Sequence, residues 1–404
     1  MERNRKGNLP LTLALIASTL VCVLLLLSSN SGCFLFERRS EDRNEDINGN
    51  RGVVDEYDYM LTMIKELYIG EFNESELHAE AMRALAESLD DWSFYMTAEE
   101  YEAFIYRANN QYTGIGVEVT IDEETGGMRI VGVFSGAPAE LAGVLVGDVI
   151  THIDGHSVSG LTISEMRDLL ARPIGDYAVL TVLGEDEDRA ELFVMYAEVF
   201  VDPIKFDMIE GNIGYITINN FDAKSAEPFI NAIEELLGLG ASSFIYDVRA
   251  NAGGRVSELT MMLDYLLPEG EIFVQIDRSG NEQVTTSDEE WLDVPAVVIV
   301  DRHSYSAAEY FAAILGEYEY AQVVGEQTTG KSRSQTTHKL PSGGALHIST
   351  GQYLTKNRVS LFDAGGLTPD YEVDLTDEEF ALFITGSLDI DDDPQLQKAI
   401  SLLQ

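Results

Sequence analysis

The pattern of hydrophobic and polar positions changes several times along this chain of 404 residues. Residues 11–27 are almost wholly apolar, whereas residues 37–52 are polar and charged and have no hydrophobic period. In residues 53–108 apolar side chains recur at the spacing of amphipathic helices. We therefore expect an apolar N-terminal segment over residues 1–36, a polar tether over 37–52 and a small helical region over 53–108.

From Gly114 the period of the apolar positions becomes two, which is typical of half-buried strands. Short helical stretches interrupt this pattern. The predicted strands are 115–120, 128–134, 148–153 and 178–183, and the predicted helices are 137–142 and 163–171. This order of elements predicts a separate domain of strands and short helices over residues 109–200.

A third pattern fills residues 201–404, where short apolar runs alternate with helical stretches. The runs 244–248 and 296–300 are mostly apolar at successive positions, as in strands of a parallel sheet that is covered on both faces. Between strands, residues 225–237 have apolar side chains at helical spacing. The pattern therefore predicts a layered α/β domain.

The chain is strongly acidic, with 26 Lys and Arg residues against 70 Asp and Glu residues and a net charge of −44. Such a chain repels phosphate backbones, and no basic stripe offsets the charge, so a nucleic-acid-binding function is excluded. The hydrophobic share of 45% is that of a globular protein and argues against a disordered acidic polymer.

Cysteine and histidine usage excludes several chemistries. The two cysteines, Cys22 and Cys33, lie in or beside the apolar N-terminal segment, so the folded part has no disulfide framework, thiol nucleophile or cysteine-based metal site. The six histidines do not have the H-E-x-x-H spacing of zinc hydrolases, and the acidic run 389–393 lacks the glycine and glutamate spacing of an EF-hand. We expect no metal and no cofactor.

The N-terminal segment predicts attachment to, or passage through, a bacterial cell membrane. Arg3, Arg5 and Lys6 precede the apolar run, which is typical of a signal anchor or signal peptide whose positive end stays in the cytoplasm. Cys33 follows Ser31 and Gly32, so lipidation after cleavage is the alternative to a retained single-pass anchor. In each case the folded part is expected to work outside the cytoplasm.

A glycine-rich turn opens the first predicted strand of the second domain. Its residues are Thr113, Gly114, Ile115, Gly116 and Val117. Exposed N–H groups in such a turn can hold the terminal carboxylate of a peptide, and the following strand edge can pair with that peptide. With the elements that follow, the region resembles a PDZ domain. A plain hairpin opened by glycines is the alternative.

Two strand–turn–helix corners carry candidate chemistry. The first, 247–254, ends in Gly253 and Gly254, whose uncovered N–H groups suit an oxyanion hole, although a simple tight turn would also use them. The second, 301–309, presents Ser306 at a helix start, where it is either a nucleophile or, with Glu309, an ordinary capping box.

A serine nucleophile needs a base. His303 stands on the same turn as Ser306 and is poorly situated to face its hydroxyl, so we expect an ordinary loop histidine. Lys331 follows an apolar strand and could act as a base if burial keeps it neutral. Gln335 is four residues further on and could orient the amine. A solvated lysine is the alternative.

The ordered set of motifs resembles the carboxyl-terminal processing (tail-specific) serine peptidases over about residues 55–402. The motifs are LDDWSFYMTAEEY at 89–101, GYITINNF at 214–221, DVRANAGG at 247–254, SYSAAE at 304–309, TGK at 329–331 and DPQLQKAI at 393–400.

This resemblance implies a PDZ domain inserted before a ClpP/crotonase-like α/β catalytic core. It also implies that Ser306 is the nucleophile, Lys331 the base and Gln335 the residue that orients the lysine. The oxyanion hole would be the N–H of Ala307 with that of Gly253 or Gly254. Arg172, after the second PDZ helix, would help to communicate peptide occupancy to the active site.

The chain departs from the family pattern at four positions. Ala252 replaces the usual proline, Tyr305 and Ala308 alter the serine motif, and Ser332 stands where glycine is common. None of these changes removes a catalytic group, so we expect an active enzyme.

The resulting hypothesis is a membrane-tethered, extracytoplasmic serine endopeptidase. Its partners would be protein substrates with exposed, apolar C-terminal tails. The helical region 53–108 could support a homodimer. The alternative is a catalytically inactive, membrane-anchored PDZ adaptor in which Ser306 is only a helix cap.

Overall fold

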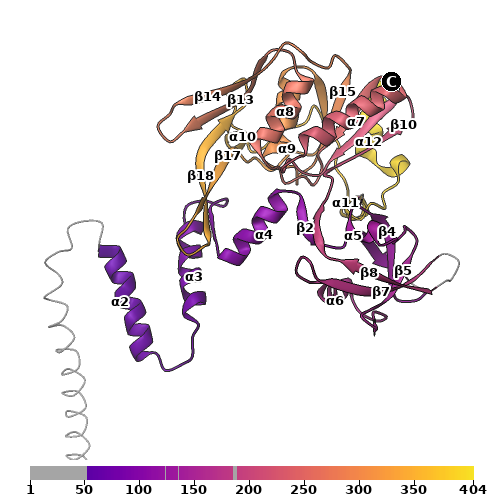
Figure 1. Ribbon diagram of the computed structural model, residues 1–404. Coiled ribbons are helices and arrows are strands. Elements are labelled where there is room, and N and C mark those ends of the chain that lie inside the picture. The colour runs from indigo at the N-terminus through magenta and orange to yellow at the C-terminus, as the bar shows by residue number, and fades with distance from the viewer. Residues whose placement is uncertain (1–51, 123, 135, 185–188) are drawn as a thin grey trace, which may run out of the picture. The chain divides into compact units, whose positions relative to one another are not determined.

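The computed structural model describes residues 52–404 except 123, 135 and 185–188 (Figure 1). The chain divides into two units, Met1–Leu77 and His78–Gln404. The predicted anchor and nearly all of the predicted tether lie outside the described residues. Within the described ranges no helix combines the length and the apolar character needed to cross a membrane.

Three helices lie within residues 52–108. They are α2 (Gly52–Leu67), α3 (Glu74–Glu87) and α4 (Ala98–Ala108). Helix α4 begins at a capping box in which Thr97 accepts from the Glu100 N–H, while the Glu100 carboxylate accepts from the Thr97 N–H. Just before it, β1 (Phe94–Met96) pairs antiparallel with β18 (Ala345–Leu354), so this N-terminal segment joins a sheet from the far end of the chain.

The PDZ region is a twisted antiparallel sheet with two short helices. Its strands in spatial order are β3 (Val117–Ile121), β4 (Met128–Val133), β5 (Val149–Ile153), β7 (Tyr177–Leu183) and β8 (Arg189–Met195), and β6 (His156–Ser157) pairs with β5. The helices are α5 (Pro138–Leu141) and α6 (Ile163–Leu169). Strands β2 (Gln111–Gly114) and β9 (Ala197–Phe200) form a ribbon where the chain enters and leaves. Within the described residues β3 lies at an edge of the sheet.

The α/β region contains the mostly parallel sheet that the apolar runs predicted. Its spatial order is β10 (Ile204–Ile209), β11 (Ile213–Ile218), β12 (Ser243–Asp247), β15 (Ala296–Val300), β16 (Ala321–Gly325) and β19 (Tyr371–Glu372). Only the β10–β11 pair among these described strands is antiparallel.

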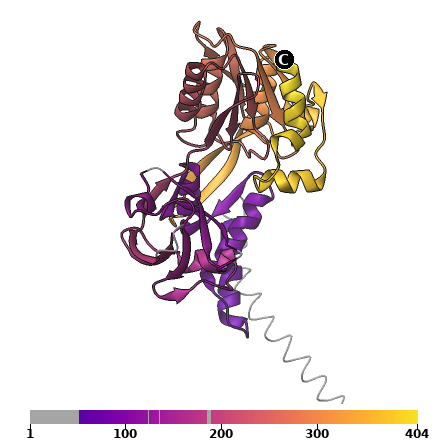
Figure 2. The same ribbon diagram turned by 90° about the vertical axis from the view of Figure 1, so that its right-hand side faces the viewer.

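Helices cover both faces of this sheet (Figure 2). Phe244 and Tyr246 pack with α7 (Ala226–Leu239), α8 (Val256–Leu266) and α9 (Ala307–Glu317) on one face. Ile245, between them in sequence, packs against α12 (Pro394–Leu403) on the other face. Because successive strand residues point to opposite faces, burial on both sides explains the uninterrupted apolar runs.

A second sheet was not predicted. It is built from β13 (Gly270–Asp277), β14 (Glu282–Ser287), β17 (Arg333–Lys339), β18 and β1. Strand β14 reads EQVTTS and is largely exposed, and β17 is polar along its length, so neither has an apolar alternation. The short helices α10 (Leu361–Ala364) and α11 (Asp377–Ile384) follow β18.

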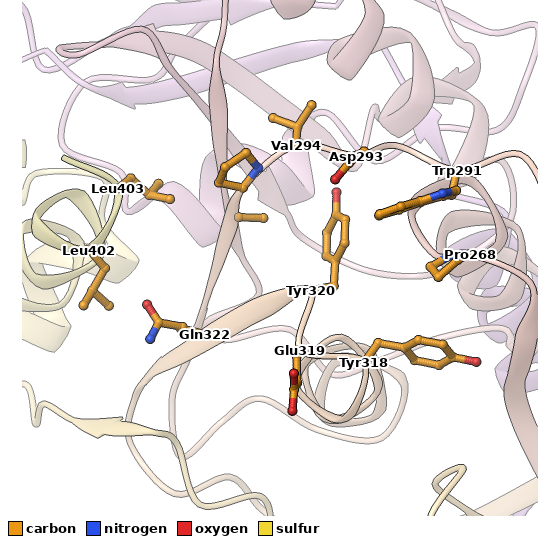
Figure 3. A pocket seen from close by; sticks show the side chains of 12 residues that line it. Pro268, Trp291, Asp293, Val294, Tyr318, Glu319, Tyr320, Gln322, Leu402 and Leu403 are labelled. Atoms are coloured by element: carbon orange, nitrogen blue, oxygen red, sulfur yellow. The ribbon is translucent and has the colours of Figure 1, made fainter.

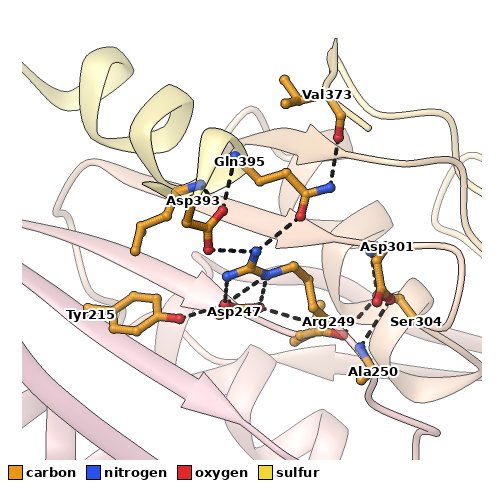
Figure 4. Close-up of polar contacts among 11 residues, drawn as sticks. Tyr215, Asp247, Arg249, Ala250, Asp301, Ser304, Val373, Asp393 and Gln395 are labelled. Carbon is orange, nitrogen blue, oxygen red and sulfur yellow. Dashed lines mark hydrogen bonds and ion pairs between the residues drawn. The ribbon is translucent and has the colours of Figure 1, made fainter. Parts of the chain in front are cut away.

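A buried ionic cluster joins the end of β12 to the start of α12 (Figure 4). Arg249 Nη2 lies 2.6 Å from Asp247 Oδ2, and its Nη1 lies 2.8 Å from Asp393 Oδ2 and 3.1 Å from Gln395 Oε1. The Tyr215 hydroxyl donates to Asp247 Oδ2 at 2.6 Å. All of these charged groups are buried, so each depends on the others for hydrogen bonds that water cannot supply.

We predict that Arg249→Met destabilises this region by about 3–5 kcal/mol, because the carboxylates of Asp247 and Asp393 would stay buried without their cation. The measurement is urea denaturation followed by fluorescence. Arg358→Met is the control, because Arg358 pairs with the part-exposed carboxylates of Glu271 and Glu282, so this substitution should change the stability far less than Arg249→Met. Equal losses for both variants would contradict the assignment of the Arg249 cluster as a structural anchor.

Candidate active site

The two predicted corners form one site. They follow β12 and β15, which are parallel neighbours in the sheet, so their carboxyl ends lie side by side. The Tyr305 N–H donates to the Asn251 carbonyl at 3.0 Å, and the Ala250 N–H donates to Asp301 Oδ1 at 3.0 Å. These two hydrogen bonds hold one turn against the other.

Ser306 sits in a strained conformation at the start of α9. Its φ is +57°, a region that non-glycine residues rarely adopt and that costs on the order of 1–3 kcal/mol. Its N–H donates to Glu309 Oε2 at 2.8 Å. Ser304, the other serine of the motif, is buried and donates to the Val248 carbonyl at 2.8 Å. The two serines therefore differ: Ser304 supports the turn, and Ser306 is the half-buried serine at the helix start.

The glycine pair lies against the serine turn. A side-chain carbon on Gly253 would come within 2.9 Å of both Ser306 Cβ and the Ala307 nitrogen, so only glycine permits this approach. The Gly253 N–H already donates to Asn251 Oδ1 at 2.8 Å. In the part of the chain that the structure describes, the N–H groups of Gly254 and Ala307 have no protein acceptor. Of the two glycines expected to contribute to an oxyanion hole, Gly254 is therefore the one whose N–H is without a protein acceptor among the described residues, and its role in an oxyanion hole stays a prediction.

Lys331 is a buried lysine on the loop after β16. Only 9% of its surface is exposed, and its Nζ lies 4.8 Å from the centre of the Tyr305 ring. Burial lowers the pKa of Lys331 to about 8, while the negative charges of Asp90 and Glu309 act in the opposite direction and raise it. The lysine is therefore substantially neutral at mildly alkaline pH.

Glu309 joins the two predicted catalytic residues through their backbones. Its fully buried carboxylate accepts from the N–H of Ser306 at 2.8 Å and from the N–H of Lys331 at 3.0 Å. It also accepts from the Thr328 hydroxyl and the Gly330 N–H. The sequence pattern predicts only a capping glutamate at this position. The signal for a larger role is that Glu309 is the one acidic residue within the stretch 307–315, which is buried throughout.

We expected Gln335 to hydrogen-bond to the Lys331 amine, but its amide has other partners. Its Nε2 donates to the Arg333 carbonyl at 3.0 Å and to Ser349 Oγ at 3.1 Å. Across the described residues no hydrogen bond joins Lys331 Nζ to Gln335 or to Ser306 Oγ. The structure thus brings the backbones of the pair together, with the amine resting over Tyr305.

Asp90 is a site residue that sequence analysis missed. It accepts from the Ser93 N–H at 2.7 Å and from Arg333 Nη1 at 3.0 Å. The Arg333 guanidinium in turn lies 5.6 Å from the Trp92 ring. The negative charge of Asp90 raises the pKa of Lys331, so a residue near the start of the described chain acts on the site. The quoted LDDWS motif contained this residue, but nothing in its spacing indicated where its carboxylate points.

Tyr353 of β18 is a second missed residue. Its hydroxyl donates to the Lys331 carbonyl and lies 3.3 Å from Ser306 Oγ. Ser332, the departure beside the lysine, accepts from the Phe362 N–H at 3.0 Å and so holds α10.

The glycine turn of the PDZ region lies beside a tyrosine, because a side-chain carbon on Gly114 would clash with the ring of Tyr112. Gly116 has a φ of +83°, and a side-chain carbon there would lie 2.2 Å from Ala137 Cβ. Burial raises the pKa of Tyr112, while the nearby backbone N–H groups of Gly116 and Val117 act to lower that pKa. The predicted carboxylate-binding turn therefore has the phenol of Tyr112 beside it.

Two other predicted residues make local contacts. Arg172 pairs with Asp154 and donates to the Tyr177 carbonyl at 3.3 Å, so its described contacts lie within the PDZ region. His303 stacks on Phe380 of α11 with a ring-centre distance of 4.8 Å, which agrees with its interpretation as an ordinary loop histidine.

One cavity within the described residues lies away from this site (Figure 3). It has a volume of about 410 Å³ and is lined by residues that include Trp291, Asp293, Tyr318 and Tyr320. It opens at the N-terminal ends of β15 and β16, whereas the serine and lysine follow the C-terminal ends of the same strands. It contains none of the predicted catalytic residues.

We predict that Lys331 reacts with acetic anhydride with a midpoint near pH 8, because only the neutral amine reacts and its pKa is lowered to about 8. Asp90→Asn removes a charge that raises this pKa, so the midpoint should move to lower pH. Mass spectrometry of competitively labelled peptides measures both. Asp91→Asn, the adjacent carboxylate, is the control and should leave the midpoint in place. A midpoint above pH 10, or no response to Asp90→Asn, would contradict this electrostatic account.

Comparisons with known proteins agree with these features. Residues 212–373 match the model of peptidase family S41, and residues 129–183 match a PDZ domain model. Carboxy-terminal processing protease CtpA of Bacillus subtilis is 29% identical over 317 residues, which cover 78% of this chain and 67% of that protein. A carboxy-terminal-processing protease of Bartonella bacilliformis is 28% identical over 377 residues, with 84% of this chain and 86% of that protein covered.

A solved structure supports the fold. It is from Bacteroides fragilis, is described as an S41 protease, and superposes with a TM-score of 0.52 at 18% identity. The superposition covers 82% of this chain and 90% of the other. The family matches identify residues 212–373 as a peptidase family S41 domain and residues 129–183 as a PDZ domain, and over most of its length the chain is similar to carboxy-terminal processing proteases, which are serine-type peptidases.

Proposed function

We propose that this peptidase is an endopeptidase that uses Ser306 as nucleophile and Lys331 as general base. The observation that carries the proposal is the buried Glu309 carboxylate, which accepts from the backbone N–H groups of both residues. The lowered pKa of Lys331 also supports it, because a lysine must be neutral to accept a proton.

In the proposed reaction Ser306 Oγ attacks a peptide carbonyl, and Lys331 Nζ takes the hydroxyl proton and then delivers it to the leaving amine. The carbonyl oxygen rests on the N–H groups of Gly254 and Ala307, donors worth roughly 3–4 kcal/mol each. Water then hydrolyses the acyl-enzyme. The amine must turn from the Tyr305 ring toward Ser306, as catalytic hydrogen bonds often tighten only with substrate bound.

The proposed substrates are proteins with exposed, apolar C-terminal tails. The tail would pair with the edge of β3, and its carboxylate would bind the N–H groups of the Gly114–Gly116 turn, beside Tyr112. The curated relatives are named for processing at the carboxy terminus, which supports this assignment.

We further infer that residues 11–27 hold the chain at a bacterial cell membrane with the peptidase outside the cytoplasm, supported by the positive residues before the apolar run. Lipidation at Cys33 is the alternative attachment. A homodimer through residues 53–108 is also proposed, supported by the amphipathic helix α2. The helix-covered parallel sheet supports a ClpP/crotonase-like core.

We predict that the full chain, purified in mild detergent, cleaves an unfolded protein that ends in small apolar residues. The same protein ending in two aspartates should be cleaved several-fold more slowly. Ser306→Ala and Lys331→Ala should each lower the rate by at least a hundredfold, because nucleophile and base act as a unit. Products are identified by mass spectrometry.

Ser304→Ala is the matched control, since it removes a serine hydroxyl from the same motif but none of the proposed chemistry. Some rate loss through the turn is expected, smaller than that of Ser306→Ala. Cleavage that survives Ser306→Ala would contradict the nucleophile. Absence of cleavage by any version, with the apolar tail still bound, would support the inactive adaptor.

A further inference from the structure

Tyr353 occupies a buried position between the nucleophile and the base. It is 4% exposed, and its hydroxyl lies 3.3 Å from Ser306 Oγ and also contacts the Lys331 carbonyl. Its N–H donates to the Ser332 carbonyl at 3.0 Å, and its ring packs edge-on against Tyr310 at 5.5 Å. These ring and backbone contacts do not involve the hydroxyl, so Tyr353→Phe would keep them.

The hydrogen-bonding capacity of the hydroxyl is limited. It has one hydrogen, and a carbonyl oxygen can only accept, so the hydrogen is available either to the Lys331 carbonyl or to Ser306 Oγ at one time. Burial raises the pKa of Tyr353 well above its ordinary value, so the group stays protonated and acts as a donor at working pH.

We propose that Tyr353 is a further catalytic residue, whose hydroxyl donates to Ser306 Oγ and stabilises the negative charge that develops on that atom. The inference rests on the proposed Ser/Lys function. The Lys331 carbonyl is the acceptor at rest, and Ser306 Oγ becomes the better acceptor as its proton leaves, because a charged acceptor forms the stronger hydrogen bond.

The proton balance of the step leaves tyrosine unchanged. In acylation the Oγ–H bond breaks, the Nζ–H bond of Lys331 forms, and Oγ bonds to the substrate carbonyl carbon. In deacylation Oγ is the leaving group and receives the proton back from Lys331. Tyr353 keeps its own hydrogen in both steps and lowers the energy of the charged oxygen.

The test compares Tyr353→Phe with Tyr310→Phe in the full chain. Tyr310 is the matched control because it is a buried tyrosine of the same aromatic cluster, whose hydroxyl donates to the Leu354 carbonyl at 2.8 Å. Two rates are measured from pH 6 to 10: modification of Ser306 by a fluorophosphonate and single-turnover cleavage of the apolar-tailed protein. Urea denaturation of each variant and the affinity for the apolar tail are measured in parallel.

Tyr353→Phe should lower the alkaline plateau of both rates by roughly 10- to 100-fold, as for loss of one donor to a developing charge. The pH midpoint and the tail affinity should not change. Tyr310→Phe should keep both rates within about threefold. These results together would distinguish a donor to Oγ from a residue that only supports the fold.

Three results would overturn the inference. The first is a plateau for Tyr353→Phe equal to that of the parent. The second is an unchanged plateau with a displaced midpoint, which would mean that Tyr353 acts only through the Lys331 backbone. The third is an equal loss in Tyr310→Phe. A parent chain that neither cleaves nor reacts at Ser306 would instead overturn the proposed function, and this inference with it.

If Tyr353→Phe does not fold, 3-fluorotyrosine at position 353 keeps the ring packing and makes the hydroxyl a stronger donor. A faster rate of Ser306 modification would support the inference, and an unchanged or slower rate would overturn it.

Discussion

The arrangement of this peptidase depends on one buried carboxylate, that of Glu309. It accepts hydrogen bonds from the N–H groups of Ser306 and Lys331, and from two further donors on the loop before the lysine. A buried carboxylate is tolerated only when such donors replace water. The chain therefore satisfies this group only when the helix of the serine and the loop of the lysine are both in place.

The residues around Glu309 position the site and determine the protonation of Lys331. Parallel strands β12 and β15 bring two turns to the same sheet edge, and the Arg249 cluster fixes the start of α12 at the end of β12. Within this frame burial lowers the pKa of Lys331, while Asp90 and Glu309 oppose that effect. These two acidic residues therefore keep the pKa of Lys331 from falling further.

The sequence predicted most helices and strands of the PDZ and α/β regions, because the pattern of apolar residues within a short stretch is enough to indicate them. Apolar runs such as 296–300 and the alternation in 178–183 appear as β15 and β7, close to the predicted bounds. Strands β14 and β17 of the second sheet were not predicted because both are polar. The hydrophobic pattern of a strand reflects its burial, and no residue of β17 and only Ser287 of β14 is buried.

The residues of the site also fall into those that the sequence predicted and those that it did not. Ser306 and Lys331 stood in recognisable turns, but Tyr353 and Asp90 reach them from strands and turns that are distant in sequence. The bridging role of Glu309 was hidden because a capping box explained the same spacing. Gln335 was expected at the lysine amine, yet the register of β17 and β18 directs its amide to Ser349. Such contacts depend on tertiary packing, which a linear pattern does not contain.

The most direct test of this account is a crystal structure of the full chain after reaction with a peptidyl phosphonate. We predict one adduct on Ser306 Oγ, with a phosphonyl oxygen on the N–H groups of Gly254 and Ala307, Lys331 Nζ turned toward Oγ, and Glu309 still bonded to both backbones. An adduct on another residue, or an oxygen held by donors elsewhere in the chain, would contradict the account.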